Sequence, residues 1–293
     1  MRQRSDAHRL RKRNQLTVLS LNAPEEDLPP GSFTADPEIT ETVIRMRRLS
    51  AAHDGLKIVH LSDIHLSLYT SIEEVQRVVD LANAQQPDLI ALTGDYVTFS
   101  PTYIWPAARA LGRLRARLGT FAVLGNHDFR VSAEEITRAL CAQRIRVLRD
   151  SHYPLRSGRG TLWLVGVDDL WGAFENLPRA LGPVPAHEPK ILLCHNPLAI
   201  GRAARLDVDL MLSGHTHGGQ VRLPLIRSFY RSKFGERFVE GWNQLGNTQI
   251  YVSRGIGKVV LPLRLACPPE ITCLCLRREP GITAPRTRRQ HLM

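Results

Sequence analysis

The stretch Leu56-Lys-Ile-Val-His-Leu-Ser-Asp-Ile-His65 and the segment after it decide the fold. Leu56–Leu61 is a short apolar run that ends in a polar turn, as expected of a buried strand. Ser71-Ile-Glu-Glu74 is a capping box that predicts a helix, and Pro87 ends that helix. Asp88–Leu92 is the next short apolar run. This strand–helix–strand order predicts parallel pairing of the strands and an α/β fold.

The same alternation continues through the first half of the chain, and strands predominate in the second half. Helices are expected around 103–118 and from Ser132 onward, and further strands at Thr120–Leu124, Ile145–Leu148, Thr161–Val167, Lys190–Cys194, Val208–Leu212, Gln249–Ser253 and Ile271–Leu276. The smaller share of helices in the second half favours a mixed or second sheet. We therefore expect one domain over residues 38–278, with a tail at 1–37 and another at 279–293.

The composition is that of a folded domain. Of the 293 residues, 43% are hydrophobic and 23% are charged, which excludes a mainly disordered or fibrous chain. No run approaches the ~18 apolar residues of a membrane-spanning helix, and Leu16–Leu21 is too short and polar for a signal-peptide core. Five cysteines without a CxxC pair favour reduced thiols. We expect a cytoplasmic protein and leave open a peripheral location on the inner face of the cell membrane.

The net charge of +11 is concentrated at the two ends of the chain. Residues 1–13 carry six basic residues and one acidic residue, residues 277–293 carry five and one, and about +2 remains for everything between. A nearly neutral body lacks the basic track that a nuclease groove needs, so nucleic acid is disfavoured as a partner. The basic ends are either attracted to an anionic membrane or simply solvated.

Five of the predicted strands are followed by polar residues of one chemical kind. The clusters are Asp63-Ile-His65, Gly94-Asp95, Gly125-Asn126-His127-Asp128, His195-Asn196 and Gly214-His215-Thr-His217. Loops beyond the carboxyl ends of strands converge on the binding crevice of open α/β sheets, so we expect these side chains to meet at one place. The glycines allow the backbone to turn sharply directly before a candidate ligand.

The chemistry of these clusters points to metal ions. Imidazole nitrogen combined with carboxylate and amide oxygen suits Mn, Fe, Co or Zn, and the lack of cysteine argues against a structural zinc site. Seven side chains are candidate ligands: Asp63, His65, Asp95, Asn126, His195, His215 and His217. Seven ligands are too many for one ion, and they fit two ions that share a carboxylate and clamp the attacking and leaving oxygens of an in-line displacement. We expect two divalent ions, with Mn favoured and Fe, Zn or Co as alternatives.

Taken together, these motifs resemble those of the calcineurin-like metallophosphoesterase superfamily, over roughly residues 40–277. The resemblance implies a sandwich of two mixed β-sheets flanked by helices, with a dinuclear metal centre at one edge. It implies that one ion is held by Asp63, His65, Asp95 and His217, and the other by the bridging Asp95, Asn126, His195 and His215. It also implies that His127 is a catalytic histidine outside the ligand set, oriented and made more basic by Asp128.

Within the superfamily, Gly218-Gly-Gln220 and parts of Arg254–Ile271 resemble a bacterial branch of peripheral-membrane phosphoesterases that includes UDP-2,3-diacylglucosamine hydrolases. The resemblance implies hydrolysis of phosphodiester or pyrophosphate bonds by a metal-bridging hydroxide. The implied substrate is a phosphorylated small molecule or a lipid-linked or nucleotide-linked compound. Two alternatives are a metal-dependent nuclease and a catalytically inactive metal-binding module.

Basic and aromatic residues interleave in Arg222–Phe234, directly after the last metal motif. Arg227, Arg231 and Lys233 are candidates for binding an anionic, partly apolar substrate or a lipid headgroup layer. The alternative is an amphipathic surface element whose aromatic side chains pack on the sheet. Our hypothesis is that this loop selects the substrate while the metal ions supply the chemistry.

Overall fold

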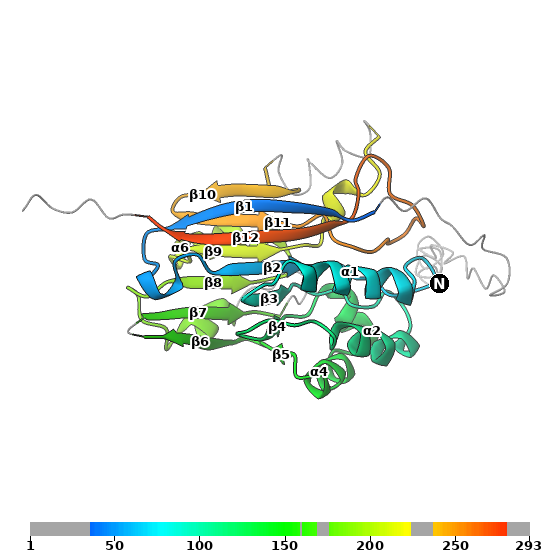
Figure 1. Cartoon of the computed structure of the whole chain (residues 1–293), viewed down its shortest axis with the longest axis horizontal. Coiled ribbons are helices and arrows are strands. Elements are labelled where there is room, and N and C mark those ends of the chain that lie inside the picture. The colour runs from blue at the N-terminus through cyan, green and yellow to red at the C-terminus, as the bar shows by residue number, and fades with distance from the viewer. Residues whose placement is uncertain (1–35, 159, 169–175, 224–236, 280–293) are drawn as a thin grey trace, which may run out of the picture. The chain divides into compact units, whose positions relative to one another are not determined.

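The computed structural model describes residues 36–158, 160–168, 176–223 and 237–279, and it places two six-stranded β-sheets among them (Figure 1). The first sheet has the order β1-β12-β2-β3-β4-β5, with β1 (Glu38–Met46), β2 (Lys57–Leu61), β3 (Leu89–Leu92), β4 (Thr120–Ala122), β5 (Arg146–Val147) and β12 (Glu270–Arg278). The second has the order β10-β11-β9-β8-β7-β6, with β6 (Ser151–Ser157), β7 (Gly160–Gly166), β8 (Lys190–Leu193), β9 (Leu210–Ser213), β10 (Gly241–Leu245) and β11 (Thr248–Val252).

Both sheets are mixed, as the sequence predicts. Strands β2 to β5 pair in parallel, and so do β7, β8, β9 and β11. Strand β12 runs antiparallel to β2, and the hairpins β6–β7 and β10–β11 close the second sheet at its two edges. The parallel strands at the centre of each sheet therefore end at a common edge, where their following loops meet.

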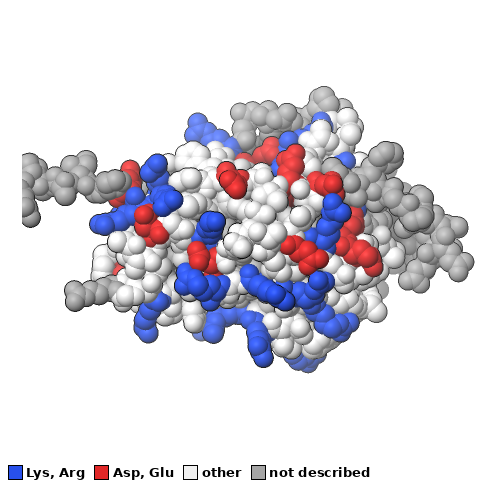
Figure 2. All heavy atoms as spheres, in the orientation of Figure 1, with Lys and Arg blue, Asp and Glu red and all other residues white. Residues whose placement is uncertain are grey.

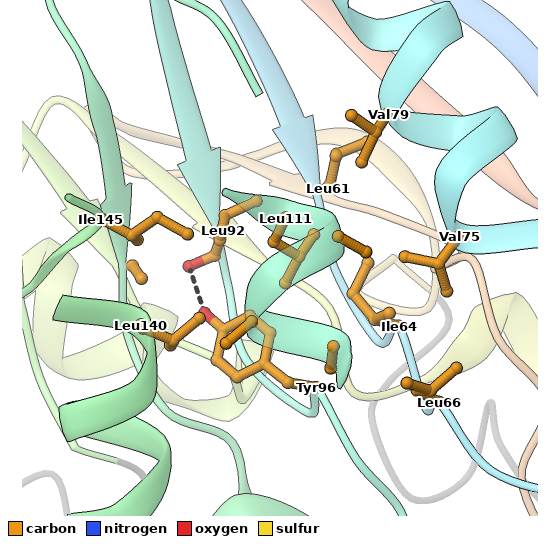
Figure 3. Packing of buried hydrophobic residues seen from close by; sticks show 14 of the residues in the cluster. Leu61, Ile64, Leu66, Val75, Val79, Leu92, Tyr96, Leu111, Leu140 and Ile145 are labelled. Atoms are coloured by element: carbon orange, nitrogen blue, oxygen red, sulfur yellow. Dashed lines mark hydrogen bonds between the residues drawn. The ribbon is translucent and has the colours of Figure 1, made fainter. Parts of the chain in front are cut away.

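Helices cover the outer faces of both sheets. They are α1 (Ile72–Ala84), α2 (Ile104–Leu111), α3 (Asn126–Val131), α4 (Ala133–Ala142), α5 (Leu177–Leu181) and α6 (Ile200–Arg205), with 3-10 turns η1 (Ala51–His53), η2 (Pro101–Tyr103), η4 (Pro197–Ala199) and η5 (His217–Gly219). The first sheet packs on α1, α2 and α4 through a cluster that includes Val75, Leu92 and Leu140 (Figure 3). The second sheet packs on α5 and α6, and a third cluster fills the space between the sheets. The order of layers is helix, sheet, sheet, helix.

The local signals at the helix ends explain where α1 begins and α2 stops. The Ser71 hydroxyl accepts from the Glu74 N–H at 3.2 Å, and the Glu74 carboxylate accepts from the Ser71 N–H at 2.7 Å, so the predicted capping box is confirmed. The helix expected over 103–118 is shorter: α2 ends at Leu111, and Gly112 follows as its C-cap. Glycine has a low helix propensity, which favours the end of the helix at this point over its continuation.

Some expectations fall on parts of the chain that the structure does not describe. Apart from Asp36, Pro37 and Glu279, the expected tails at 1–37 and 279–293 lie outside the described residues, and so do Arg227, Arg231 and Lys233. In the part of the chain that is described, no helix has the length and apolar character to cross a bilayer.

Candidate metal centre

The seven candidate ligands follow strands of both sheets. Asp63 and His65 follow β2, Asp95 follows β3, and Asn126 opens α3 after β4. The second sheet supplies His195 after β8, and His215 and His217 after β9. The loops are joined by backbone hydrogen bonds, since the N–H groups of Asp63 and His65 donate to the carbonyls of Gly94 and Asp95, each at 2.9 Å. The motifs therefore lie together at the edge where the two sheets meet.

Distances between donor atoms show how closely they gather. The Asp95 Oδ2 atom lies 3.4 Å from His65 Nε2 and 3.2 Å from His195 Nε2. His217 Nε2 lies 3.1 Å from His65 Nε2 and 3.3 Å from Asp63 Oδ1. His215 Nδ1 lies 3.1 Å from His195 Nε2. These six side chains form one continuous cluster.

The hydrogen bonds of His195 show that the cluster suits a cation. Its Nδ1 lies 2.7 Å from the Thr93 carbonyl, which can only accept, so Nδ1 carries the proton. In the neutral ring Nε2 then directs a lone pair toward the Asp95 carboxylate, which is also an acceptor. Two acceptors that face each other at 3.2 Å repel unless a cation lies between them. A backbone carbonyl that holds the far nitrogen of a ligating histidine is the usual support of a metal site.

The protonation states also fit metal ligands. Burial alone would raise the pKa of Asp95, but the imidazoles of His195 and His65 hold it well below its usual range. Burial, together with the nearby His65 and Arg264, holds the pKa of His217 well below its usual range. An ionised carboxylate and a neutral imidazole are the forms that bind metal ions.

Three sets of donor atoms lie within 4.8 Å of one another: Asp63–His65–His217, Asp63–Asp95–His195 and His65–Asp95–His127. The first contains three of the four ligands expected for one ion, and the second combines Asp63 of that ion with Asp95 and His195. The third includes His127, which is expected outside the ligand set. Asn126 is buried, and its Oδ1 atom has no hydrogen-bond partner among the described residues. An unpaired buried amide oxygen is costly, and a metal ion would satisfy it.

The backbone of these loops is strained at the candidate ligands. Asp63, His65, Asp95, His215 and His217 all have positive φ, between 48° and 72°. Non-glycine residues rarely adopt this left-handed conformation, and where they do the surrounding structure holds them there. This strain indicates that the conformation of these loops is determined by the placement of the candidate ligands.

Two glycines allow the loops to approach the carboxylates closely. A Cβ atom on Gly125 would lie 2.3 Å from Asp95 Oδ1, and one on Gly214 would lie 2.1 Å from Asp63 Oδ2. Both distances are shorter than any contact that real Cβ atoms make. The glycines of these motifs are therefore required for space beside the carboxylates.

Gly214→Ala should lower the free energy of unfolding by at least about 2 kcal/mol, because the methyl group displaces Ser62 and Asp63. It should also lower metal affinity. The matched control is Gly201→Ala in α6, where the nearest atom to the new Cβ is 3.9 Å away, and where alanine should stabilise the helix by about 0.5–1 kcal/mol. Urea denaturation of both variants measures the difference. Similar stabilities for the two variants would refute the steric argument.

The role expected for Asp128 is corrected by its contacts. Asp128 does not orient His127 in the structure, because both of its carboxylate oxygens accept from backbone N–H groups, those of Asp95 at 2.8 Å, Tyr96 at 2.9 Å and Gly125 at 2.9 Å. His127 instead places Nδ1 3.1 Å from the Thr98 carbonyl. Asp128 therefore joins the loops after β3 and β4 and positions Asp95. Burial and the charge of Asp95 raise the pKa of Asp128 to about 7.

Several supporting residues were not predicted from the sequence. Thr98 places its hydroxyl 3.1 Å from His65 Nδ1, and Tyr96 donates to the carbonyls of Leu92 at 3.4 Å (Figure 3) and Val123 at 2.8 Å. Arg264 is buried, with Nη2 3.3 Å from His217 Nδ1 and 2.9 Å from the Arg254 carbonyl. No spacing marks these residues, because their contacts arise only when distant loops meet.

The comparisons with known proteins agree with this site. Residues 56–219 match the family described as calcineurin-like phosphoesterase. The chain is 35% identical to the uncharacterized metallophosphoesterase YkuE of Bacillus subtilis, over 82% of this chain and 85% of that protein. It is 36% identical to the phosphodiesterase YaeI of Escherichia coli, over 74% and 81% of the two chains. The chain belongs to the calcineurin-like phosphoesterase family.

Two further similarities are more limited. The chain is 32% identical to a zebrafish (Danio rerio) protein named transmembrane protein with metallophosphoesterase domain, over 83% of this chain and 58% of that protein. The crystal structure of TT1561 of Thermus thermophilus superposes with a TM-score of 0.48 at 17% identity, over 69% of this chain and 90% of that one.

Proposed function

We propose that this metallophosphoesterase hydrolyses phosphodiester or pyrophosphate bonds with two divalent metal ions. The observation that carries the proposal is the position of Asp95, whose Oδ2 atom lies 3.4 Å from His65 Nε2 and 3.2 Å from His195 Nε2. One carboxylate oxygen facing both ligand sets is what a bridge between two ions requires. Asp63, His65 and His217 would complete one site, and Asn126, His195 and His215 the other.

When bound, the two ions supply Lewis-acid stabilisation of the phosphoryl charge and a water of lowered pKa. Side chains of the protein position the ligands and transfer the proton. Asp128 fixes the backbone of Asp95, and the Asp95 Oδ1 atom accepts from the His127 N–H at 2.8 Å. Because the Thr98 carbonyl holds the Nδ1 proton of His127, Nε2 is the atom that, in the protonated ring, can donate its proton to the leaving oxygen.

The basic side chains near the cluster favour a diester over a monoester. Arg264 donates to the carbonyls of Gly257 and Arg254, and the Lys258 ammonium donates to the Tyr69 carbonyl at 2.7 Å and the Glu74 carboxylate at 2.9 Å. Among the described residues these cations are occupied by protein groups. A monoester carries a second negative charge that needs a further cation, and a diester does not. The name phosphodiesterase, given to the relative YaeI, supports the same substrate class.

The surface charges bear on the nuclease alternative. Figure 2 shows acidic and basic side chains intermixed on the upper part of the face in view and mainly basic side chains along its lower part, and the ion pairs Arg113–Asp80 and Arg117–Asp88 involve some of the basic residues. A nuclease needs a continuous basic track toward its site. Outside residues 1–13 and 277–293 the net charge is only about +2, so we favour a small or lipid-linked substrate over nucleic acid.

A substrate panel with manganese added tests the proposal. The panel contains an aryl phosphodiester, the matching aryl monoester, a UDP-linked diacyl lipid, a cyclic nucleotide and duplex DNA. We expect hydrolysis of the diester to exceed that of the monoester by at least about tenfold in kcat/KM, which corresponds to about 1.4 kcal/mol. Preference for DNA would establish the nuclease alternative, and a lack of activity on every compound would support the inactive module.

A further inference from the structure

Most of the large apolar side chains that the described residues expose lie on the loops around the metal centre. Six of them form what we call the apolar rim: Leu68 after β2, Phe99 after β3, and Val260, Leu261, Leu263 and Leu265 between β11 and β12. Phe99 is 67% exposed and Val260 is 75% exposed. Solvent rarely surrounds so many large apolar groups near one site unless they contact a partner.

Hydrogen bonds join the loops that carry the apolar rim. Leu66 and Val97 form a β-bridge beside Leu68 and Phe99, and Lys258 joins the loop of Val260 to Tyr69 and Thr70. The rim also borders the metal centre, since the Phe99 and His127 rings are 6.0 Å apart. In Figure 1, the orange-brown loop between β11 and β12 lies at the end of the sheets where α1 begins.

The Gln220 side chain hydrogen-bonds to the backbone of the loop between β11 and β12 from the buried side. Its side-chain nitrogen donates to the carbonyls of Val259 at 2.9 Å, Leu261 at 3.1 Å and Leu263 at 3.2 Å, and its oxygen accepts from the Val259 N–H at 2.9 Å. Gln220 itself is only 5% exposed. The loop therefore presents leucine and valine side chains outward while its carbonyls are satisfied within the protein. A segment that enters hydrocarbon must satisfy its backbone in this way.

The sequence that follows one of the rim's contacts is basic. The sequence from Arg222 to Arg237, which begins two residues after Gln220, has five basic residues and one acidic residue. Arg222 directly follows Val221, which forms a β-bridge with the rim residue Leu265. Apolar side chains combined with neighbouring basic residues are the pattern of proteins that bind an anionic membrane interface.

We propose that the apolar rim docks on the surface of an anionic lipid bilayer, with the metal centre facing the headgroups. A folded protein seated on the rim would cover the opening of the site. A bilayer covers the rim and at the same time brings phosphate-bearing headgroups to it. The proposal depends on the proposed function only for the position of the site, and docking itself requires neither metal nor hydrolysis.

The test compares two triple variants of the full chain in vesicle flotation. The rim variant carries Leu68→Gln, Val260→Asn and Leu261→Gln, where asparagine suits the positive φ of 65° at Val260. The matched control carries Ile39→Gln, Val43→Gln and Leu245→Gln, which are exposed apolar residues on β1 and β10. Vesicles of phosphatidylglycerol with phosphatidylcholine are used, and because the wild type and both variants carry the same basic residues, a difference between them reports on the apolar rim.

We expect the wild type and the control to float with the vesicles, and the rim variant to partition at least about tenfold more weakly. Hydrolysis of a soluble aryl diester should be equal in all three proteins and shows that the rim variant is folded. Equal partitioning of the two variants, or a wild type that does not float, would overturn the proposal. Floating without any diester hydrolysis would instead contradict the proposed function and leave docking intact.

Discussion

Asp95→Asn should lower kcat/KM for a phosphodiester by at least about a thousandfold and reduce the number of bound metal ions. The amide can still accept the His127 N–H as Asp95 Oδ1 does, so the loop should keep its shape. It cannot supply the negative charge at Oδ2, which faces both His65 and His195. Metal ions contribute several kcal/mol of transition-state stabilisation, and about 4 kcal/mol corresponds to a thousandfold.

The matched control is Asp88→Asn at the opposite end of the same strand. Asp88 accepts from the Lys57 N–H at 3.0 Å and from Arg117 at 2.9 Å, far from the metal centre. Breaking an exposed ion pair costs little, so activity should stay within about twofold of the wild type. Steady-state kinetics and elemental analysis on the same preparations measure both effects. An Asp95→Asn enzyme with full metal content and normal kcat would show that Asp95 is not a bridge.

His127→Ala should lower kcat by about a hundredfold to ten-thousandfold while metal content stays unchanged, because general acid catalysis contributes factors of this size. The loss should be largest for diesters with an alkyl leaving group, whose oxygen needs a proton. It should be much smaller for a nitrophenyl leaving group, which departs as a stable anion. Comparison of the two substrates therefore separates proton transfer from metal binding.

His152→Ala is the matched control for His127→Ala. His152 also places Nδ1 beside a backbone carbonyl, that of Ala180 at 2.9 Å, but it lies on β6 away from the metal centre. The control should keep normal kcat on both substrates. If His127→Ala instead loses metal, His127 belongs to the ligand set with His65 and Asp95, whose donor atoms lie within 4.8 Å of one of its nitrogens.

The central strands were predictable because burial on both faces leaves a simple signal. Strands β3, β8 and β9 are buried at every position, and each appears in the sequence as a short apolar run. The edge strands carry no such signal. β6 reads Ser-His-Tyr-Pro-Leu-Arg-Ser and β10 reads Gly-Trp-Asn-Gln-Leu, with mostly polar or exposed positions. Each pairs in a hairpin with the strand that directly follows it, but without an apolar run the sequence does not mark the strand itself.

The short helices were missed for a related reason. α5 has five residues and α6 has six, fewer than the two turns needed to display an apolar periodicity. β1 was also hard to predict, since its apolar residues do not alternate regularly and its partner β12 lies at the far end of the chain. A pattern can indicate a strand without indicating where that strand pairs.

The sequence predicts the ligand types of the metal centre, but it does not predict the residues that support those ligands. The ligand types follow from the residues that end the strands, and six of the seven candidate side chains lie in one chain of close contacts. The role of Asp128 could not be predicted, because the sequence places it beside His127 whereas folding directs it to the backbone of Asp95 and Tyr96. Arg264 reaches His217 from the loop before β12 for the same reason.

The central claim is that the chain holds two metal ions that share Asp95. It is tested most directly by titrating the metal-free protein with manganese while bound metal and phosphodiester hydrolysis are followed together. We predict two ions per chain, with full activity only after the second has bound. Full activity with a single ion, or with none, would contradict the account.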